Sequence, residues 1–240
     1  MKTSDRSTPG FDFAVIAIIL GFALWGTFGL VSDEPHLEGR TVYSWLRQAA
    51  NNTYDNFPAT CEAVNVFKRN RSAAVPGLIR IIEKPYSSGA PWLKKHQWLF
   101  ARLQTKRENS MNDEIVDRSW AIMICADIGP EAKSANPAIM NACCDPQWSV
   151  RREAAKALPK TGVPPAVAVP ILSRMLLHDD YYEVRAWAAY SLGLLGEESK
   201  AAIPALRTAT NDPNGWPASW ARKALEKIQS ADNKAKDSHP

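Results

Sequence analysis

The chain has 240 residues, of which 45% are hydrophobic, so it holds enough apolar material for a packed domain, and a wholly disordered protein is excluded. Its 29 Lys and Arg residues against 25 Asp and Glu give a formal charge of +4, spread along the whole chain. Because a dedicated binder gathers its basic residues into one dense patch, this balance argues against nucleic acid as a partner.

After a polar opening at residues 1–12, residues 13–32 form a stretch of twenty residues without a charged side chain. A helix of that length rises about 1.5 Å per residue and reaches about 30 Å, the thickness of a bilayer's hydrocarbon core. We therefore predict a transmembrane helix or an uncleaved signal anchor at residues 13–32. The alternative is a cleaved signal peptide with a poor cleavage site between Thr27 and Gly29, which would make the protein secreted.

The flanks of this stretch predict its orientation in the membrane. Lys2 and Arg6 precede it, whereas the charged residues that follow are the acidic Asp33, Glu34 and Glu38, with no Lys or Arg before Arg40. Since positive flanks stay inside, we expect residues 1–12 in the cytoplasm and the remainder of the chain outside it, in the periplasm. Residues 33–58 are expected to form a linker and a capping helix whose apolar face consists of Val42, Trp45, Leu46 and Ala49.

Residues 59–229 repeat themselves at intervals that are typical of a solenoid. Three residue types recur with spacings of 33 and 34 residues: Gly129, Gly162 and Gly196; Pro137, Pro170 and Pro204; and Arg118, Arg151 and Arg185. Each unit is predicted to contain two helices. The glycine ends the first helix in a left-handed conformation, and the proline opens the second helix, where its missing N–H costs nothing.

Upstream lies a more divergent unit, in which Pro76 is predicted to open the second helix, followed by an irregular helix at residues 91–104. Downstream, the residues from 218 to 229 are predicted to be a terminal copy of the first helix, with Ala218 in place of the arginine. The polar residues 230–240 lack periodic apolar positions, which predicts a disordered tail.

A column of aspartates, Asp145, Asp179 and Asp212, closes successive second helices, and Arg151 and Arg185 each follow an aspartate by six residues. The pattern resembles the HEAT repeat, in particular the short bacterial HEAT-like units of phycobilisome-lyase-type proteins. With the preceding apolar segment it is similar to exported bacterial HEAT-repeat proteins over about residues 39–229. The resemblance implies an all-α fold, a right-handed α-α superhelix. It also implies a structural ladder of hydrogen bonds formed by Asp145, Arg151, Asp179 and Arg185.

We found no pattern of residues that predicts catalysis, a metal site or a cofactor. The four histidines are isolated, and His178 beside Asp179 and Asp180 is more simply read as a solvated helix end. There is no His-Glu pair of the kind that HEAT-like di-iron hydroxylases use, nor a phosphate-binding loop or esterase motif. The four cysteines, Cys61, Cys125, Cys143 and Cys144, lack ligand spacing and are predicted to be small core residues.

Three tryptophans, Trp120, Trp187 and Trp220, share one position of the repeat, at the boundary between the apolar face and solvent. They are either an aromatic column of binding hot spots or rings that fill the grooves between repeats. The tryptophans and the outward positions of the second helices, Asn141, Arg174 and Arg207, are our predicted partner-binding residues.

The sequence thus predicts a non-catalytic, membrane-anchored scaffold that binds a protein or peptide partner. One alternative is a lyase-like or accessory module that holds a small apolar ligand or chromophore between repeats. Another is a DNA-binding array similar to the HEAT-like alkylpurine glycosylases, which the predicted extracytoplasmic location disfavours.

Overall fold

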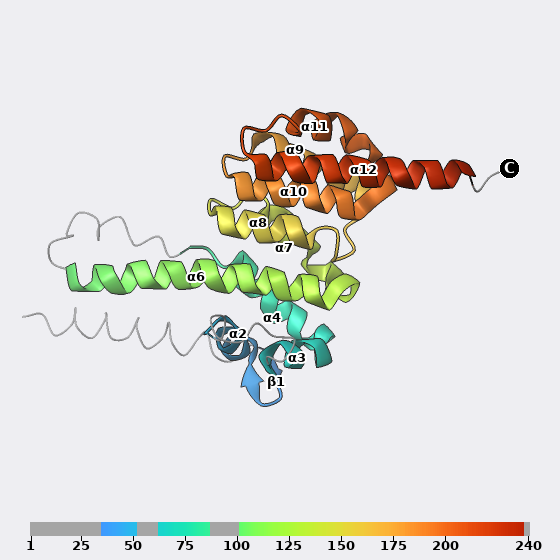
Figure 1. Ribbon diagram of the computed structural model, residues 1–240. Coiled ribbons are helices and arrows are strands. Elements are labelled where there is room, and N and C mark those ends of the chain that lie inside the picture. The colour runs from blue at the N-terminus through green and yellow to red at the C-terminus, as the bar shows by residue number, and fades with distance from the viewer. Residues whose placement is uncertain (1–34, 52–61, 87–100, 238–240) are drawn as a thin grey trace, which may run out of the picture. The chain divides into compact units, whose positions relative to one another are not determined.

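The computed structural model describes residues 35–51, 62–86 and 101–237, and almost all of them are helical (Figure 1). Helices pack in series, so that the fold is an all-α solenoid. No helix among the described residues is long and apolar enough to cross a membrane. The predicted membrane segment at residues 13–32 lies outside the described residues.

The described chain opens with a small hairpin that the sequence did not predict. Strands β1 (His36–Leu37) and β2 (Arg40–Thr41) pair antiparallel. The two-residue turn between them has positive φ at Glu38 and Gly39, 50° and 80°, as tight hairpin turns require. Helix α2 (Val42–Asn51) follows at once, and the Trp45 indole N–H donates a hydrogen bond to the Leu37 carbonyl at 2.8 Å. The hairpin is thereby fixed to α2.

Helices α3 (Glu62–Arg69), α4 (Arg71–Glu83) and the long α6 (Ala101–Ile128) complete the N-terminal part. Gly77 lets α4 approach α2 closely, because a Cβ atom at this position would lie 2.9 Å from the side chain of Val42. Arg47 of α2 forms ion pairs with Asp113 and the buried Asp117 of α6, at 2.8 and 3.1 Å. Apolar packing and these ion pairs together hold α2 against α6.

The C-terminal part consists of regular helix pairs. The first helices are α6, α8 (Trp148–Ala157), α10 (Tyr182–Leu195) and α12 (Gly215–Asp237), and they lie side by side in that order (Figure 1). The second helices are α7 (Asn136–Ala142), α9 (Pro165–His178) and α11 (Ile203–Ala209). The 3₁₀ segments η2 (Gly129–Ala135) and η3 (Gly196–Ala202) lead into α7 and α11.

Small residues set the distance between the first helices. The alanines that face neighbouring repeats are fully buried, as at Ala155, Ala188 and Ala221. A Cβ atom at Gly193 of α10 would lie 3.2 Å from Ala224 of α12, so these two helices are near the closest approach that side chains permit. The predicted helix ends are confirmed at Gly129 and Gly196, where φ is 82° and 57°. Gly162 also has a positive φ of 76°, but α8 ends before it, at Ala157.

Three further predicted boundaries are wrong. Pro137 and Pro204 stand at the second position of their helices, but Pro76 and Pro170 lie inside α4 and α9. In α9 the Pro164-Pro165 pair already starts the helix one and a half turns earlier, and Pro170 forgoes one backbone hydrogen bond. The segment predicted to be a disordered tail from residue 230 is helical through Asp237, because its alanines and lysines extend α12.

Candidate interaction surfaces

Charged pairs link the regular units at the start of each first helix. Arg151 of α8 donates from Nε and Nη2 to both carboxylate oxygens of Asp179, at 2.6 and 2.8 Å. Arg185 of α10 makes the same two bonds to Asp212, at 2.7 and 3.0 Å. In each case Nη1 donates to the carbonyl of the preceding aspartate, Asp145 or Asp179, at 2.9 and 2.8 Å. Each arginine therefore joins the ends of two successive second helices.

The aspartates have a second role at the turns into the first helices. Oδ1 of Asp145, Asp179 and Asp212 accepts a hydrogen bond from the backbone N–H two residues further on, at 2.8, 3.0 and 2.8 Å. Burial would raise the pKa of Asp212, but the bonds from Arg185 and from the Asn214 N–H prevail and hold it below its usual value. This carboxylate is therefore stabilised in its charged form.

A third pair, between Arg118 and Asp145, precedes these two in the chain and has a different geometry. Arg118 donates one bond to Asp145, at 2.5 Å, and another to the Lys84 carbonyl, while its buried Nε has no partner within the described part of the chain. Tyr86 donates its hydroxyl to Oδ1 of Asp145 at 2.7 Å, and its ring lies 3.9 Å from the Arg118 guanidinium. The three pairs are called the ladder below, and each pair is a rung.

The predicted residues of the second helices lie in solvent. Asn141, Arg174 and Arg207 are exposed on α7, α9 and α11, one per unit, and they form what we call the second-helix row. Nη2 of Arg174 lies 3.2 Å from Sγ of Cys144. Cys125 and Cys143 are buried, as predicted. Cys144 was also predicted to be a core residue, but it is exposed because it follows the last turn of α7.

The three predicted tryptophans are half-buried, and two of them are connected. Trp187 of α10 and Trp220 of α12 both meet the Tyr190 ring edge to face, with centroids 5.2 and 4.8 Å apart. Trp120 packs against the core from α6, and α8 between them carries the buried Glu153 at this position. Of the predicted column, Trp187 and Trp220 thus belong to one cluster of rings.

Tyr190 and two further unpredicted residues, Tyr182 and Trp216, belong to this cluster, and Trp148 and Tyr181 form a separate stacked pair in which Tyr181 adjoins Tyr182 in sequence. Trp148 of α8 stacks on Tyr181 with centroids 5.4 Å apart, and Tyr182 meets Trp216 of α12 at 5.9 Å. Trp216 also lies 6.4 Å from Trp187. The complete set, called the aromatic surface, is Trp148, Tyr181, Tyr182, Trp187, Tyr190, Trp216 and Trp220. A signal was present in the sequence, because Trp148, Tyr182 and Trp216 are each 34 residues apart.

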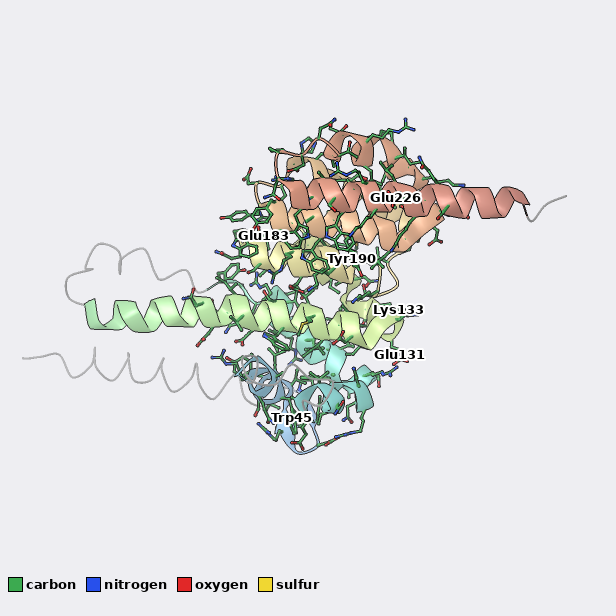
Figure 2. The ribbon with its side chains drawn as sticks, viewed as in Figure 1. Trp45, Glu131, Lys133, Glu183, Tyr190 and Glu226 are labelled. Carbon is green, nitrogen blue, oxygen red and sulfur yellow. The ribbon has the colours of Figure 1, made fainter. Side chains whose placement is uncertain are left out.

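Cations lie over four rings of the aromatic surface, among them Tyr181, whose centroid is 5.7 Å from the Arg151 guanidinium. The Arg152 guanidinium is 5.2 Å from the Trp148 centroid, and Lys156 Nζ and Lys223 Nζ are 4.8 and 4.5 Å from Trp187 and Trp220. Arg152 and Lys156 also form ion pairs with the buried Glu153. Figure 2 marks Glu183 and Tyr190 on α10, the middle helix of this surface. Such contacts fix the orientation of the rings.

His178 is exposed at the last residue of α9. In the described ranges, no group of three or more His, Cys, Asp or Glu side chains is placed to hold a metal ion. The arrangement offers two surfaces for contact, the second-helix row and the aromatic surface, held on a stack of helices whose register the ladder fixes.

Comparison with protein families agrees with this geometry. A model of HEAT repeats matches residues 103–193, and a model of the PBS lyase HEAT-like repeat matches residues 184–212. No curated protein matched the sequence. The matched residues contain α8, α9 and α10 entirely, together with the arginines and aspartates of all three rungs. The chain therefore contains HEAT-like repeats over residues 103–212.

Proposed function

We propose that the protein is a membrane-anchored scaffold whose repeats form a right-handed superhelix and bind a protein or peptide partner along the second helices. The observation that carries this proposal is the second-helix row, in which α7, α9 and α11 each present an exposed polar side chain. Arginine is enriched at binding hot spots, and two of the three residues are arginines. Binding alone, without a catalytic step, is the proposed activity.

The packing between repeats favours this proposal over a small apolar ligand held between them. The approach of Gly193 to Ala224 and the full burial of the facing alanines leave α10 and α12 in direct contact. A ligand pocket of ordinary size needs a few hundred cubic ångströms, which close-packed helices do not provide. A partner can reach the second-helix row without separating the repeats.

Cys144 makes a site-directed test of the second-helix row practical. It is exposed beside Arg174, whereas burial raises the pKa of Cys125 and Cys143 to about 12, which keeps these two thiols protonated and unreactive. In a Cys61→Ser background, a maleimide photocrosslinker therefore attaches to Cys144. The full chain, labelled in this way and expressed in membranes, should crosslink to a discrete partner that mass spectrometry identifies.

The double variant Arg174→Glu, Arg207→Glu should abolish this crosslink and leave the melting temperature unchanged. Lys227→Glu, which reverses an exposed charge on α12 outside the row, is the matched control and should crosslink as the parent protein does. If the double variant captures the same partner with the same yield, the row is not the binding site.

The anchor at residues 13–32 needs its own test, because it rests on the sequence alone. The full chain should remain in the membrane pellet after extraction with alkaline carbonate, and protease added outside intact cells with a permeable outer membrane should digest the repeats. Release into the carbonate supernatant would exclude an integral anchor. Protection of the repeats from external protease would reverse the proposed orientation.

A further inference from the structure

We propose that the aromatic surface is a second, separate binding site, and that it binds an extended, proline-rich peptide segment that carries acidic residues. The surface crosses the first helices α8, α10 and α12 and does not include any residue of the second-helix row. It is therefore independent of the partner site proposed above.

The rings are exposed enough for contact and are held in place. Tyr181, Tyr182 and Trp216 have exposed fractions of 45%, 40% and 39%, which is unusual for large hydrophobic side chains. Each of them packs against a neighbouring ring in a stacked, tilted or edge-to-face arrangement, so little side-chain freedom remains to be lost when a ligand binds. Preorganised Trp and Tyr side chains of this kind are typical of binding hot spots.

The spacing of the surface fits an extended polyproline II segment. Neighbouring packed helices lie roughly 8–10 Å apart, so one group of rings follows the next at about that interval along the stack. A polyproline II helix repeats every three residues, with a rise of about 3.1 Å per residue, and therefore presents the same edge about every 9 Å. A proline at every third position would meet aromatic rings on successive first helices.

The hydrogen-bond donors and the charge of the aromatic surface indicate which polar groups the peptide carries. The Trp45 indole N–H donates to a carbonyl, but those of Trp148, Trp187, Trp216 and Trp220 donate to no other residue that the structure describes. A polyproline II backbone has no internal hydrogen bonds, so its carbonyls can accept from them. Arg152, Lys156 and Lys223 border the rings. They outnumber the two nearby carboxylates, of which Glu153 is buried and pairs with two of the cations, and Glu183 accepts a hydrogen bond from Tyr182. This charge favours acidic residues between the prolines.

A membrane surface is the competing occupant, because Trp and Tyr with Lys and Arg also line bilayer interfaces. The rings, however, lie against one another, and none of them is more than half exposed, whereas insertion into a bilayer needs side chains that project beyond the fold. The geometry thus points to a peptide.

The test uses the full chain in nonionic detergent and a fluorescent peptide with three Pro-Pro-Glu triplets. Fluorescence anisotropy should show saturable binding, and the variants Tyr182→Ala and Trp216→Ala should each weaken it by about tenfold or more. Tyr43→Ala removes a tyrosine of similar exposure, 41%, on α2 and should leave the affinity unchanged. Thermal unfolding of each variant shows whether the fold is intact.

A second peptide, with three Ala-Ala-Glu triplets, has the same charge without the polyproline II conformation and should bind at least about tenfold more weakly. Equal binding of the two peptides, or unchanged affinity in both folded variants, would overturn the proposal. So would a result in which neither peptide binds, but anionic phosphatidylglycerol vesicles bind the parent protein and not the variants. The Arg174→Glu, Arg207→Glu variant should bind the peptide normally, which separates this test from that of the second-helix row.

Discussion

The rungs at Arg151 and Arg185 differ from the rung at Arg118 in how the guanidinium is used. In the two later rungs both Nε and Nη2 bind one aspartate, and Nη1 binds the carbonyl of the aspartate before it. In the first rung Nε has no partner in the described residues, and the Tyr86 hydroxyl takes the place on Asp145 that an arginine nitrogen has elsewhere.

The difference follows from what precedes each rung. Asp145 and Asp179 close α7 and α9, but α4 ends at Glu83 without an equivalent aspartate, and the Lys84 carbonyl accepts the bond from Arg118 instead. In a solenoid each unit contacts only its neighbours, so a divergent unit changes the rung beside it and leaves the next rung intact. Each rung of the ladder thus depends on the units that it joins, and the first rung differs because the unit before it is divergent.

The largest expected effect comes from breaking a regular rung. Asp179→Ala leaves the half-buried Arg151 without its carboxylate and removes the bond to the Tyr181 N–H, which should lower the free energy of unfolding by about 3 kcal/mol. Urea unfolding followed by circular dichroism measures the change. Asp180→Ala removes the neighbouring exposed carboxylate and is expected to have almost no effect; similar losses in both variants would deny the ladder its stabilising role.

Arginine-to-lysine changes compare the two kinds of rung directly. Lysine keeps the charge but cannot bind both carboxylate oxygens in the way that Nε and Nη2 of arginine do. Arg151→Lys should therefore lower the free energy of unfolding by about 2 kcal/mol. Arg118 makes a single bond to Asp145, and Arg118→Lys should cost about 1 kcal/mol. Equal losses in the same urea titration would mean that the rungs are energetically equivalent despite their geometry.

Tyr86→Phe isolates the group that is peculiar to the first rung. It removes the 2.7 Å hydrogen bond to Asp145 and keeps the ring over Arg118, with an expected loss of about 1 kcal/mol. Tyr181→Phe, at an exposed ring, is the control and should be neutral. A neutral Tyr86→Phe would show that the ring, and not the hydroxyl, completes the rung.

The smallest effect is a difference in pH dependence at the two ends of the ladder. The pKa of Asp212 is lowered, so its contribution is complete above its usual pKa of 3.8 and is lost as the pH falls further. The pKa of Tyr86 is raised by burial and by the bond to Asp145, so its contribution is complete below pH 10.0 and is lost as the pH rises further. Melting temperatures should be measured across the pH range. Asp212→Asn should reduce the fall in melting temperature at acid pH, and Tyr86→Phe should reduce the fall at alkaline pH. The reverse assignment would contradict these shifts.

The sequence predicted the regular part of the fold because that part repeats. Glycine, proline and aspartate columns recur near the turns between helices, and the three glycines do adopt positive φ. The start of α9 could not be predicted from Pro170, because Pro164-Pro165 starts this helix and a proline at its sixth position is tolerated. Tyr86 was not predicted either, since it belongs to the divergent unit and its role depends on contact with Asp145, 59 residues away.

The two candidate surfaces also differ in how far the sequence predicted them. Asn141, Arg174 and Arg207 were placed on the outer side of the second helices by periodicity, and they are exposed. Of the aromatic surface only Trp187 and Trp220 were predicted, in a column that also contained Trp120. Stacking across helices, such as Trp148 on Tyr181, depends on how neighbouring units are rotated. Periodicity within one helix does not contain that information.

The hairpin at the start of the described chain has a mechanical consequence. The Pro35 carbonyl accepts a bond from the Val42 N–H, and Trp45 bonds to Leu37. The Glu38 carboxylate accepts bonds from both Arg69 and Asn70. Tension transmitted along the chain ahead of Pro35 would therefore be shared by several bonds to α2 and to the junction of α3 and α4. These bonds would have to break before the hairpin separated from α2 and from the α3–α4 junction.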